Sequence, residues 1–170
     1  MNRLRQAAAW TYRVLITLFA AAVIVEVFLA GLGVFRAMPG ENNPVSHETF
    51  DDNFGEHAAI GSFLTGSSLL LLIVILIART RLRSIGATLG LAVLTLAEGA
   101  LGGAGEDAPV AGALHAINAV LVLGLALFLT ARAWRGNLLI PPVKLRRIAP
   151  APVPAPSMPA PTPTPSERAV

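Results

Sequence analysis

The sequence predicts an all-α protein: an integral membrane four-helix bundle built from two repeated helical hairpins, with a disordered, proline-rich C-terminal tail. Three observations lead to this fold class: the composition, four long apolar runs, and the placement of the basic residues. Of the 170 residues, 54% are apolar and only 14% are charged, and the mean hydropathy is +0.65. A soluble domain needs more charge than this to cover its surface.

Four apolar runs are long enough to cross the hydrocarbon core of a bilayer, which takes about 20 helical residues. They cover about residues 14–35, 57–78, 85–103 and 110–131. The first run is about twice as long as the apolar region of a secretory signal, and it contains Glu26, so we expect it to be a retained span. The runs are rich in Leu and Ala and lack the strict alternation of barrel strands. Residues 14–135 therefore form the expected membrane domain.

The charged residues divide between the two sides that four spans create. One side carries nearly all the bases: Arg3, Arg5, Arg13, Arg79, Arg81, Arg83, Arg132, Arg135, Lys144, Arg146 and Arg147. The other side carries the acidic residues Glu41, Glu48, Asp51, Asp52, Glu56, Glu106 and Asp107, with Arg36 as its only strong base. The positive-inside rule then predicts a multi-pass protein of the cell membrane with both termini in the cytoplasm, residues 1–13 forming a basic N-terminal segment.

The C-terminal segment, residues 136–170, has a different composition. It contains eight prolines between Pro150 and Pro165, and each proline lacks a backbone donor and has a fixed φ. We expect a disordered, partly polyproline cytoplasmic tail, which serves as a spacer or as a ligand for a proline-recognising domain. The bias toward Ala, Arg and Pro is typical of a GC-rich bacterial genome.

Several functional classes have little support in the sequence. The chain has no cysteine, so disulfides, cysteine zinc sites, iron–sulfur clusters and thiol chemistry are excluded. The net charge is +3, but the bases flank apolar runs and are not interleaved with aromatic residues, so we expect no nucleic-acid binding. Phosphate-binding, zinc-protease, hydrolase and dinucleotide motifs are missing. An enzymatic activity is not predicted.

An internal repeat is the most informative pattern. The segment Glu26-Val-Phe-Leu-Ala-Gly-Leu-Gly33 matches Glu98-Gly-Ala-Leu-Gly-Gly-Ala-Gly105, each following the pattern Glu-x-x-Leu-small-Gly-x-Gly. An external loop, an acidic pair and a span with an early histidine follow each segment. The repeat predicts two parallel hairpins related by a pseudo-twofold axis along the membrane normal.

The repeat places His57 and His115 at comparable depth, one to two turns inside the outer surface if their helices begin near Asp52 and Pro109. Each histidine shares a helix face with small or weakly polar residues at steps of three and four. These faces contain Gly61, Thr65 and Ser68 in the second span, and Asn118, Ala119, Val122 and Ala126 in the fourth. Such faces allow close helix packing or leave room for a flat ligand. His57 and His115, flanked by Gly61 and Asn118, are therefore candidate metal ligands at a haem iron.

Other interpretations of these residues stay open. Either histidine alone could be a neutral hydrogen-bonding group near the interface, and His47 in the acidic loop is expected to be solvated. Glu26 and Glu98 lie in spans where carboxylates are costly, which marks them as intramembrane polar or proton-labile residues. They serve either proton handling or polar adhesion between hairpins.

A four-helix unit with a histidine at the outer start of its second and fourth helices resembles one half of the haem A synthase family, whose full-length members contain two such bundles in tandem. It is also similar to short four-helix bacterial membrane proteins. The resemblance covers about residues 14–133 and rests on the topology, His57, His115 and the glycine segments. It implies that both histidines are axial ligands of a b-type haem. Asn53 and Phe54 stand where the synthases have a carboxylate, so the resemblance implies haem binding or electron transfer, not haem A synthesis.

These observations lead to three hypotheses of function. The first is a membrane protein that binds haem b between His57 and His115 near the outer leaflet. The second is a cofactor-free scaffold or accessory subunit that contacts a membrane partner or a second copy through Gly31, Gly33, Gly102 and Gly103. The third is an oligomeric transporter that uses Glu26 and Glu98 as proton-linked carboxylates. The lipid bilayer surrounds the protein in all three.

Overall fold

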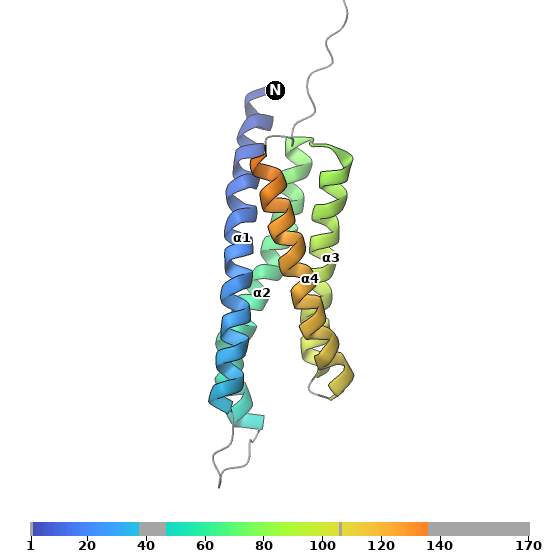
Figure 1. Cartoon of the computed structure of the whole chain (residues 1–170). Helices are drawn as coiled ribbons and strands as arrows, with labels where there is room; N and C mark the ends of the chain where they lie inside the picture. Colours follow the sequence, from blue (N-terminus) through green and yellow to red (C-terminus); the bar gives the residue numbers. More distant parts are fainter. Residues whose placement is uncertain (1, 38–46, 106, 136–170) are drawn as a thin grey trace, which may run out of the picture.

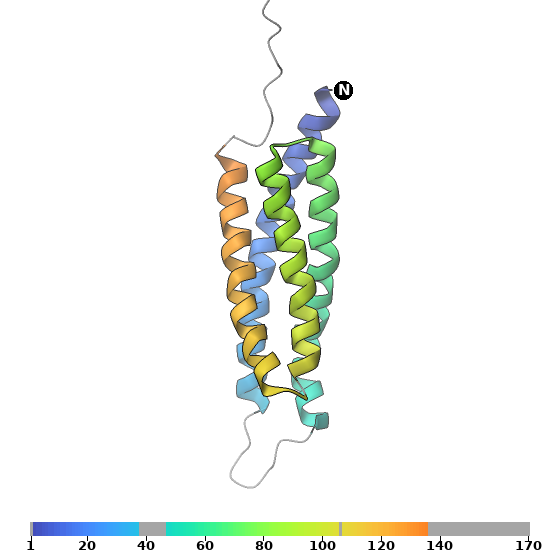
Figure 2. The same cartoon turned by 90° about the vertical axis from the view of Figure 1, so that its right-hand side faces the viewer.

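The computed structural model describes residues 2–37, 47–105 and 107–135, with the side chains of residues 2 and 47–51 excepted. These residues form four α-helices: α1 (Asn2–Ala37), α2 (His47–Ala78), α3 (Leu82–Gly105) and α4 (Pro109–Trp134). Helix α1 packs against α2 and α3 against α4, and the two hairpins together form a four-helix bundle (Figures 1 and 2). The predicted all-α four-helix fold is confirmed.

All four helices are long and apolar enough to cross a bilayer. Their outward faces carry large apolar side chains such as Phe28, Phe63 and Val120, each at least 65% exposed. In water such a surface would be unfavourable, whereas lipid chains solvate it well. The chain is therefore a multi-pass membrane protein, and its lipid-facing surface lies on all four helices.

The helices extend beyond the predicted spans. Helix α2 begins at His47 and not near Asp52, while α4 begins at Pro109 as predicted. Proline favours the first turn of a helix because the amide hydrogen that it lacks has no acceptor there. A helix can continue past the hydrocarbon layer because its backbone hydrogen bonds are internal. The predicted proline-rich tail and most of the acidic first loop lie outside the described residues.

We call the end that contains the start of α1, the α2–α3 turn and the end of α4 the basic end, and the opposite end the acidic end. In the half toward the basic end, all four helices contribute to one packed core. The largest fully buried side chains of this core are Tyr12, Ile16, Leu71, Ile75, Leu91 and Leu129. Toward the acidic end the first hairpin diverges from the second (Figure 1). The bundle is thus closed at one end and open at the other.

A buried polar contact crosses the core. The Tyr12 hydroxyl lies 2.7 Å from Thr88 Oγ1, and both residues are completely buried. Thr88 donates its single hydroxyl hydrogen to the Ser84 carbonyl oxygen at 3.0 Å. Tyr12 must therefore be the donor to Thr88. This hydrogen bond joins α1 to α3, the helices of different hairpins.

Three further side chains tie helices together at the basic end. Arg5 donates to the carbonyl oxygens of Ala78 and Arg79, at 3.4 and 3.2 Å, where α2 ends. Arg132 of α4 donates to Ser84 Oγ at 3.2 Å, and Trp134 Nε1 donates to Thr17 Oγ1 at 2.9 Å. The first contact satisfies carbonyls that have no partner within their own helix. Arg5 and Arg132 therefore connect neighbouring helices, in addition to contributing positive charge.

The turn between α2 and α3 contains a left-handed residue. Arg79 has a φ of +50°, the only positive φ among the described non-glycine residues. A left-handed residue after a helix end is common, but it is usually glycine because a Cβ atom is crowded there. Arg79 thus adopts a costly conformation. This conformation helps the chain to reverse direction between the end of α2 and the start of α3.

We predict that Tyr12→Phe lowers the free energy of unfolding in detergent by about 0.6 to 1.7 kcal/mol, the range for hydrogen bonds between membrane helices. Thr88→Val should cost a similar amount. Because both changes remove the same bond, the double variant should be less destabilised than the sum of the two. Additive losses in this double-mutant cycle would contradict a direct bond.

We predict that Arg79→Gly raises the free energy of unfolding by about 1 kcal/mol, since glycine adopts the left-handed conformation without a Cβ clash. Arg81→Gly is the matched control. It removes the same charge from the same turn at a residue whose φ is not positive. Thermal unfolding of both variants should show a gain for the first and a loss for the second.

Candidate functional site

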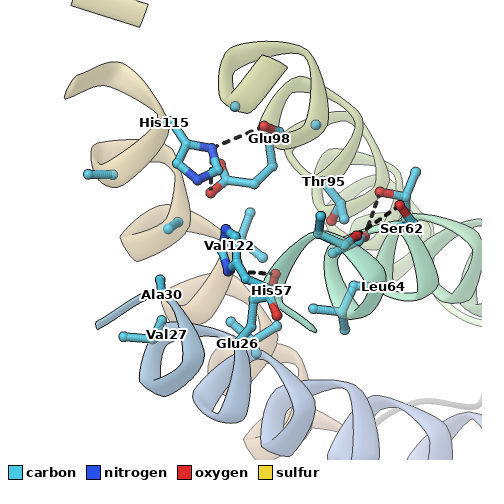
Figure 3. A pocket seen from close by; sticks show the side chains of 18 of the residues that line it. Glu26, Val27, Ala30, His57, Ser62, Leu64, Thr95, Glu98, His115 and Val122 are labelled. Atoms are coloured by element: carbon cyan, nitrogen blue, oxygen red, sulfur yellow. Dashed lines mark hydrogen bonds and ion pairs between the residues drawn. The ribbon is translucent and has the colours of Figure 1, made fainter. Parts of the chain in front are cut away.

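The half of the bundle toward the acidic end contains a cavity of about 1130 Å³. All four helices line it, and most of its surface comes from small or apolar side chains such as Ala30, Gly99 and Leu123. Its ionisable groups are Glu26, His57, Glu98 and His115. The volume matches or exceeds that of cavities that hold drug-sized ligands, about 300–1,000 Å³. Figure 3 shows the four ionisable side chains directed into this cavity.

In the first hairpin, Glu26 of α1 faces His57 of α2. Glu26 Oε1 lies 3.1 Å from His57 Nδ1, and both side chains are largely buried. The contact lacks hydrogen-bond geometry, and within the described part of the chain neither His57 Nδ1 nor Glu26 Oε2 has a hydrogen-bond partner. The Phe54 ring lies edge-on to the imidazole at a centroid distance of 6.0 Å. His57 Nδ1 and Glu26 Oε2 can therefore each form a further hydrogen bond.

In the second hairpin, Glu98 of α3 faces His115 of α4. His115 Nδ1 lies 3.3 Å from Glu98 Oε1 and 3.1 Å from the Glu98 carbonyl oxygen. Asn118, one turn further along α4, donates to Glu98 Oε2 and also to the Leu94 carbonyl oxygen at 2.9 Å. Both carboxylate oxygens of Glu98 thus have partners. This pair is fixed more firmly than the pair in the first hairpin.

The two imidazoles face each other across the gap between the hairpins. Their ring centroids are 6.0 Å apart and their planes are nearly perpendicular, at 87°. Two imidazoles that bind one metal from opposite sides through bonds of about 2 Å would have centroids roughly 6 Å apart. The observed separation is therefore close to the one that a single metal between the rings requires, and it is also typical of an edge-to-face contact between two rings.

The neighbours of the imidazoles determine which ring nitrogen is free. In both hairpins Nδ1 is the atom next to the carboxylate. A neighbouring carboxylate favours a proton on Nδ1, which leaves the Nε2 lone pair of a neutral imidazole available. Ligand histidines commonly donate their second nitrogen to a carboxylate in this way, which sets the orientation and basicity of the ring. Both histidines are thus prepared as acceptors or metal ligands.

Glycines allow the side chains of the site to approach the neighbouring helix. A Cβ at Gly61 would lie 3.0 Å from Glu26 Oε1, and one at Gly102 would lie 3.3 Å from the His115 ring. Any larger residue at either position would displace the acid or the imidazole. Gly31 and Gly103, by contrast, have open space where a Cβ would be. Among the glycines of the scaffold hypothesis, a Cβ at Gly33 or Gly102 would meet a neighbouring helix, whereas one at Gly31 or Gly103 would not.

The structure brings the sequence-predicted residues together with one difference in role. Glu26, His57, Gly61, Glu98 and His115 all line the cavity. Asn118 does not line the cavity, and instead its side-chain amide donates a hydrogen bond to the Glu98 carboxylate. The sequence analysis also missed that each glutamate pairs with the histidine of its own hairpin. The side chain of His47 lies outside the described residues.

The donor set restricts what can be bound. Among residues 2–37, 52–105 and 107–135, no three His, Asp or Glu side chains are grouped closely enough to hold a metal ion. The two histidines can supply only two ligands on opposite sides. The geometry therefore suits a metal that arrives with its other ligands, as an iron porphyrin does.

Comparisons of the chain with protein-family models, curated proteins and solved structures found no match. The resemblance to the haem A synthase family stays a prediction.

We predict that Asn118→Ala destabilises the protein by about 0.6 to 1.7 kcal/mol, because Glu98 and the Leu94 carbonyl lose their amide donor. The loss should be coupled to Glu98→Gln and independent of Glu26→Gln in double-mutant cycles of thermal unfolding. Glu26→Gln is the matched control, since it changes the equivalent carboxylate of the other hairpin. Equal coupling to both glutamates would contradict the asymmetry of the two pairs.

Proposed function

We propose that the protein binds haem b between His57 and His115 near the acidic end of the bundle, for electron transfer or haem handling. The single observation that supports this most directly is the pair of opposed imidazoles. Their centroids are 6.0 Å apart, and each has Nδ1 against a buried glutamate. When bound, haem supplies a reversible one-electron couple at its iron.

The shape of the cavity favours a flat ligand. His57 belongs to the first hairpin and His115 to the second, so a planar group perpendicular to the line between them would lie in the gap where the hairpins diverge. The residues on both sides of the gap are small, including Ala58 and Gly99 on α2 and α3, and Ala30 and Ala116 on α1 and α4. These small residues would leave room for a flat ring such as a porphyrin between the hairpins.

The two glutamates would act on the ligands and not on the iron. A carboxylate that accepts a hydrogen bond from Nδ1–H fixes the ring orientation and makes Nε2 a stronger electron donor. Glu98 is held by Asn118, whereas Glu26 has a buried oxygen without a hydrogen-bond partner. His115 is thus expected to be the better fixed ligand, and His57 the one that exchanges more readily.

The same geometry supports an origin of the two hairpins from an internal repeat. In each hairpin the glutamate lies at similar distance from the histidine, 3.1 and 3.3 Å. The glycine seven residues after each glutamate, Gly33 or Gly105, packs against the residue three positions before the histidine, Phe54 or Gly112. Equivalent contacts at equivalent sequence positions are what a duplicated hairpin would retain.

The proposed orientation follows from charge. The basic end would be cytoplasmic by the positive-inside rule, which would place the cavity in the outer half of the cell membrane. The cofactor-free scaffold remains the second candidate function. The observation in its favour is the open space around Gly31 and Gly103, although Gly103 also borders the cavity. Small residues occur where the helices of a partner approach closely.

We predict that the protein, produced with ample haem and purified in mild detergent, shows Soret and alpha bands in its reduced absorption spectrum. His57→Ala and His115→Ala should each weaken haem retention, and the double variant should abolish it. His47→Ala is the matched control, because it removes the third histidine of the chain and should leave the spectrum unchanged.

Two results would refute haem binding. One is the absence of these bands in the folded wild-type protein. The other is full haem retention by the double variant. Cross-linking that finds a stable partner only when Gly31 and Gly103 are intact would then favour the scaffold.

A further inference from the structure

A second cavity lies at the basic end, away from the imidazole pair. It has a volume of about 250 Å³ and is lined by Gln6, Ala9, Trp10 and Arg13 of α1. These residues recur at steps of three and four and thus share one face of the helix. Ala9 is 3% exposed and forms a small floor, whereas Trp10 is 55% exposed. The cavity is therefore a shallow surface site bordered by one cation and one indole.

The Arg13 side chain is held in place by aromatic residues. Its guanidinium carbon lies 5.4 Å from the centre of the Trp10 ring, within the range of a cation–π contact. Trp10 packs edge-on against Trp134 of α4 at a centroid distance of 5.7 Å. Trp134 is fixed in turn by its hydrogen bond to Thr17. The guanidinium therefore has a defined position at the junction of α1 and α4.

Arg13 differs from the other arginines of this end in its partners. Arg5 donates to two carbonyl oxygens of the α2–α3 turn, and Arg132 donates to Ser84 Oγ. Arg13 Nε is buried but has no hydrogen-bond partner within the described part of the chain. An acceptor from outside the chain cannot reach the buried Nε and would instead bind the terminal nitrogens of this half-buried guanidinium, for which no hydrogen bond to the described residues is found.

The described part of the chain offers no carboxylate for this role. Nine of the ten acidic residues lie between Glu26 and Asp107, and the tenth is Glu167 of the tail. Glu26 and Glu98 are engaged in the large cavity, and the described parts of α1 to α4 at the basic end contain no Asp or Glu. The positive charge at this end therefore requires counter-anions from the surroundings.

We propose that Arg13, Trp10 and Gln6 bind the phosphodiester group of an anionic glycerophospholipid in the leaflet that borders the basic end. A guanidinium matches the geometry of phosphate oxygens and can donate two parallel hydrogen bonds to them. The Gln6 amide supplies a further donor one turn before Trp10. Tryptophan prefers the headgroup region of a bilayer, so Trp10 and Trp134 set the depth at which the headgroup meets Arg13.

Arg5 and Arg132 have hydrogen-bond partners within the bundle, whereas Arg13 borders a cavity and its Nε has no partner among the described residues. A general attraction of basic residues to anionic lipids would depend only on the number of charges near the surface. A built site depends on the guanidinium of Arg13 itself. This difference distinguishes the proposal from simple charge attraction, and it does not depend on whether haem binds.

The test uses the full chain purified in dodecyl maltoside, with dioleoylphosphatidylglycerol, dioleoylphosphatidylcholine or inorganic phosphate added separately. Thermal unfolding and native mass spectrometry report stabilisation and bound lipid. We expect phosphatidylglycerol to stabilise the wild-type protein more than the other two additives. Arg13→Gln should weaken phosphatidylglycerol binding by about fivefold or more.

Two further variants make the test decisive. Arg3→Gln removes the same charge from an exposed position of α1 and should change binding little. Arg13→Lys keeps the charge but loses the planar fork, so it should bind at an intermediate level and also shows whether the fold tolerates a change at this position. The proposal is wrong if Arg3→Gln and Arg13→Gln weaken binding equally, or if phosphatidylcholine or inorganic phosphate stabilises the protein as well as phosphatidylglycerol does.

Discussion

The rest of the structure depends on how two carboxylates are accommodated inside a membrane-spanning bundle. A carboxylate within the hydrocarbon layer is costly unless it has a partner. Each hairpin provides an imidazole from its second helix, so that Glu26 meets His57 and Glu98 meets His115. Glycine at Gly61 and Gly102 provides the space for these contacts. The register of each hairpin is thus linked to a polar contact, in addition to apolar packing.

Polar pairs and apolar packing occupy different halves of the molecule. From Tyr12 to Val23 on α1, and in the matching parts of the other helices, side chains interlock into a continuous core. Beyond Val23 the hairpins separate around the large cavity, whose lining includes many small residues (Figure 1). A bundle that was tightly packed along its whole length would leave no room for a ligand. The closed half provides the stability that lets the other half stay open.

Much of this could be predicted from the sequence, and the reasons are physical. Long apolar runs define membrane helices because backbone groups in lipid must bond internally, and the repeated segment identified both glutamates and both histidines. The pairing of Glu26 with His57 could not be predicted, because it depends on how α1 and α2 are aligned along their lengths. The sequence of the connection between them does not determine this alignment. The role of Asn118 was missed for a similar reason, since a shift of one residue along α4 changes which helix it faces. The extension of α2 back to His47 reflects helix growth outside the bilayer, which hydropathy does not detect.

The closed core has a consequence for the electrical environment of the site. The Tyr12 to Thr88 contact and the apolar side chains around it close the cavity toward the basic end, so a charged ligand would enter from the acidic end. A charge that enters from that end crosses just part of the transmembrane field, whose full value is about 2.3 kcal/mol per elementary charge for each 100 mV. The cavity therefore does not run through the whole bundle as a channel would. Its occupancy would follow the chemistry of one compartment and respond weakly to voltage.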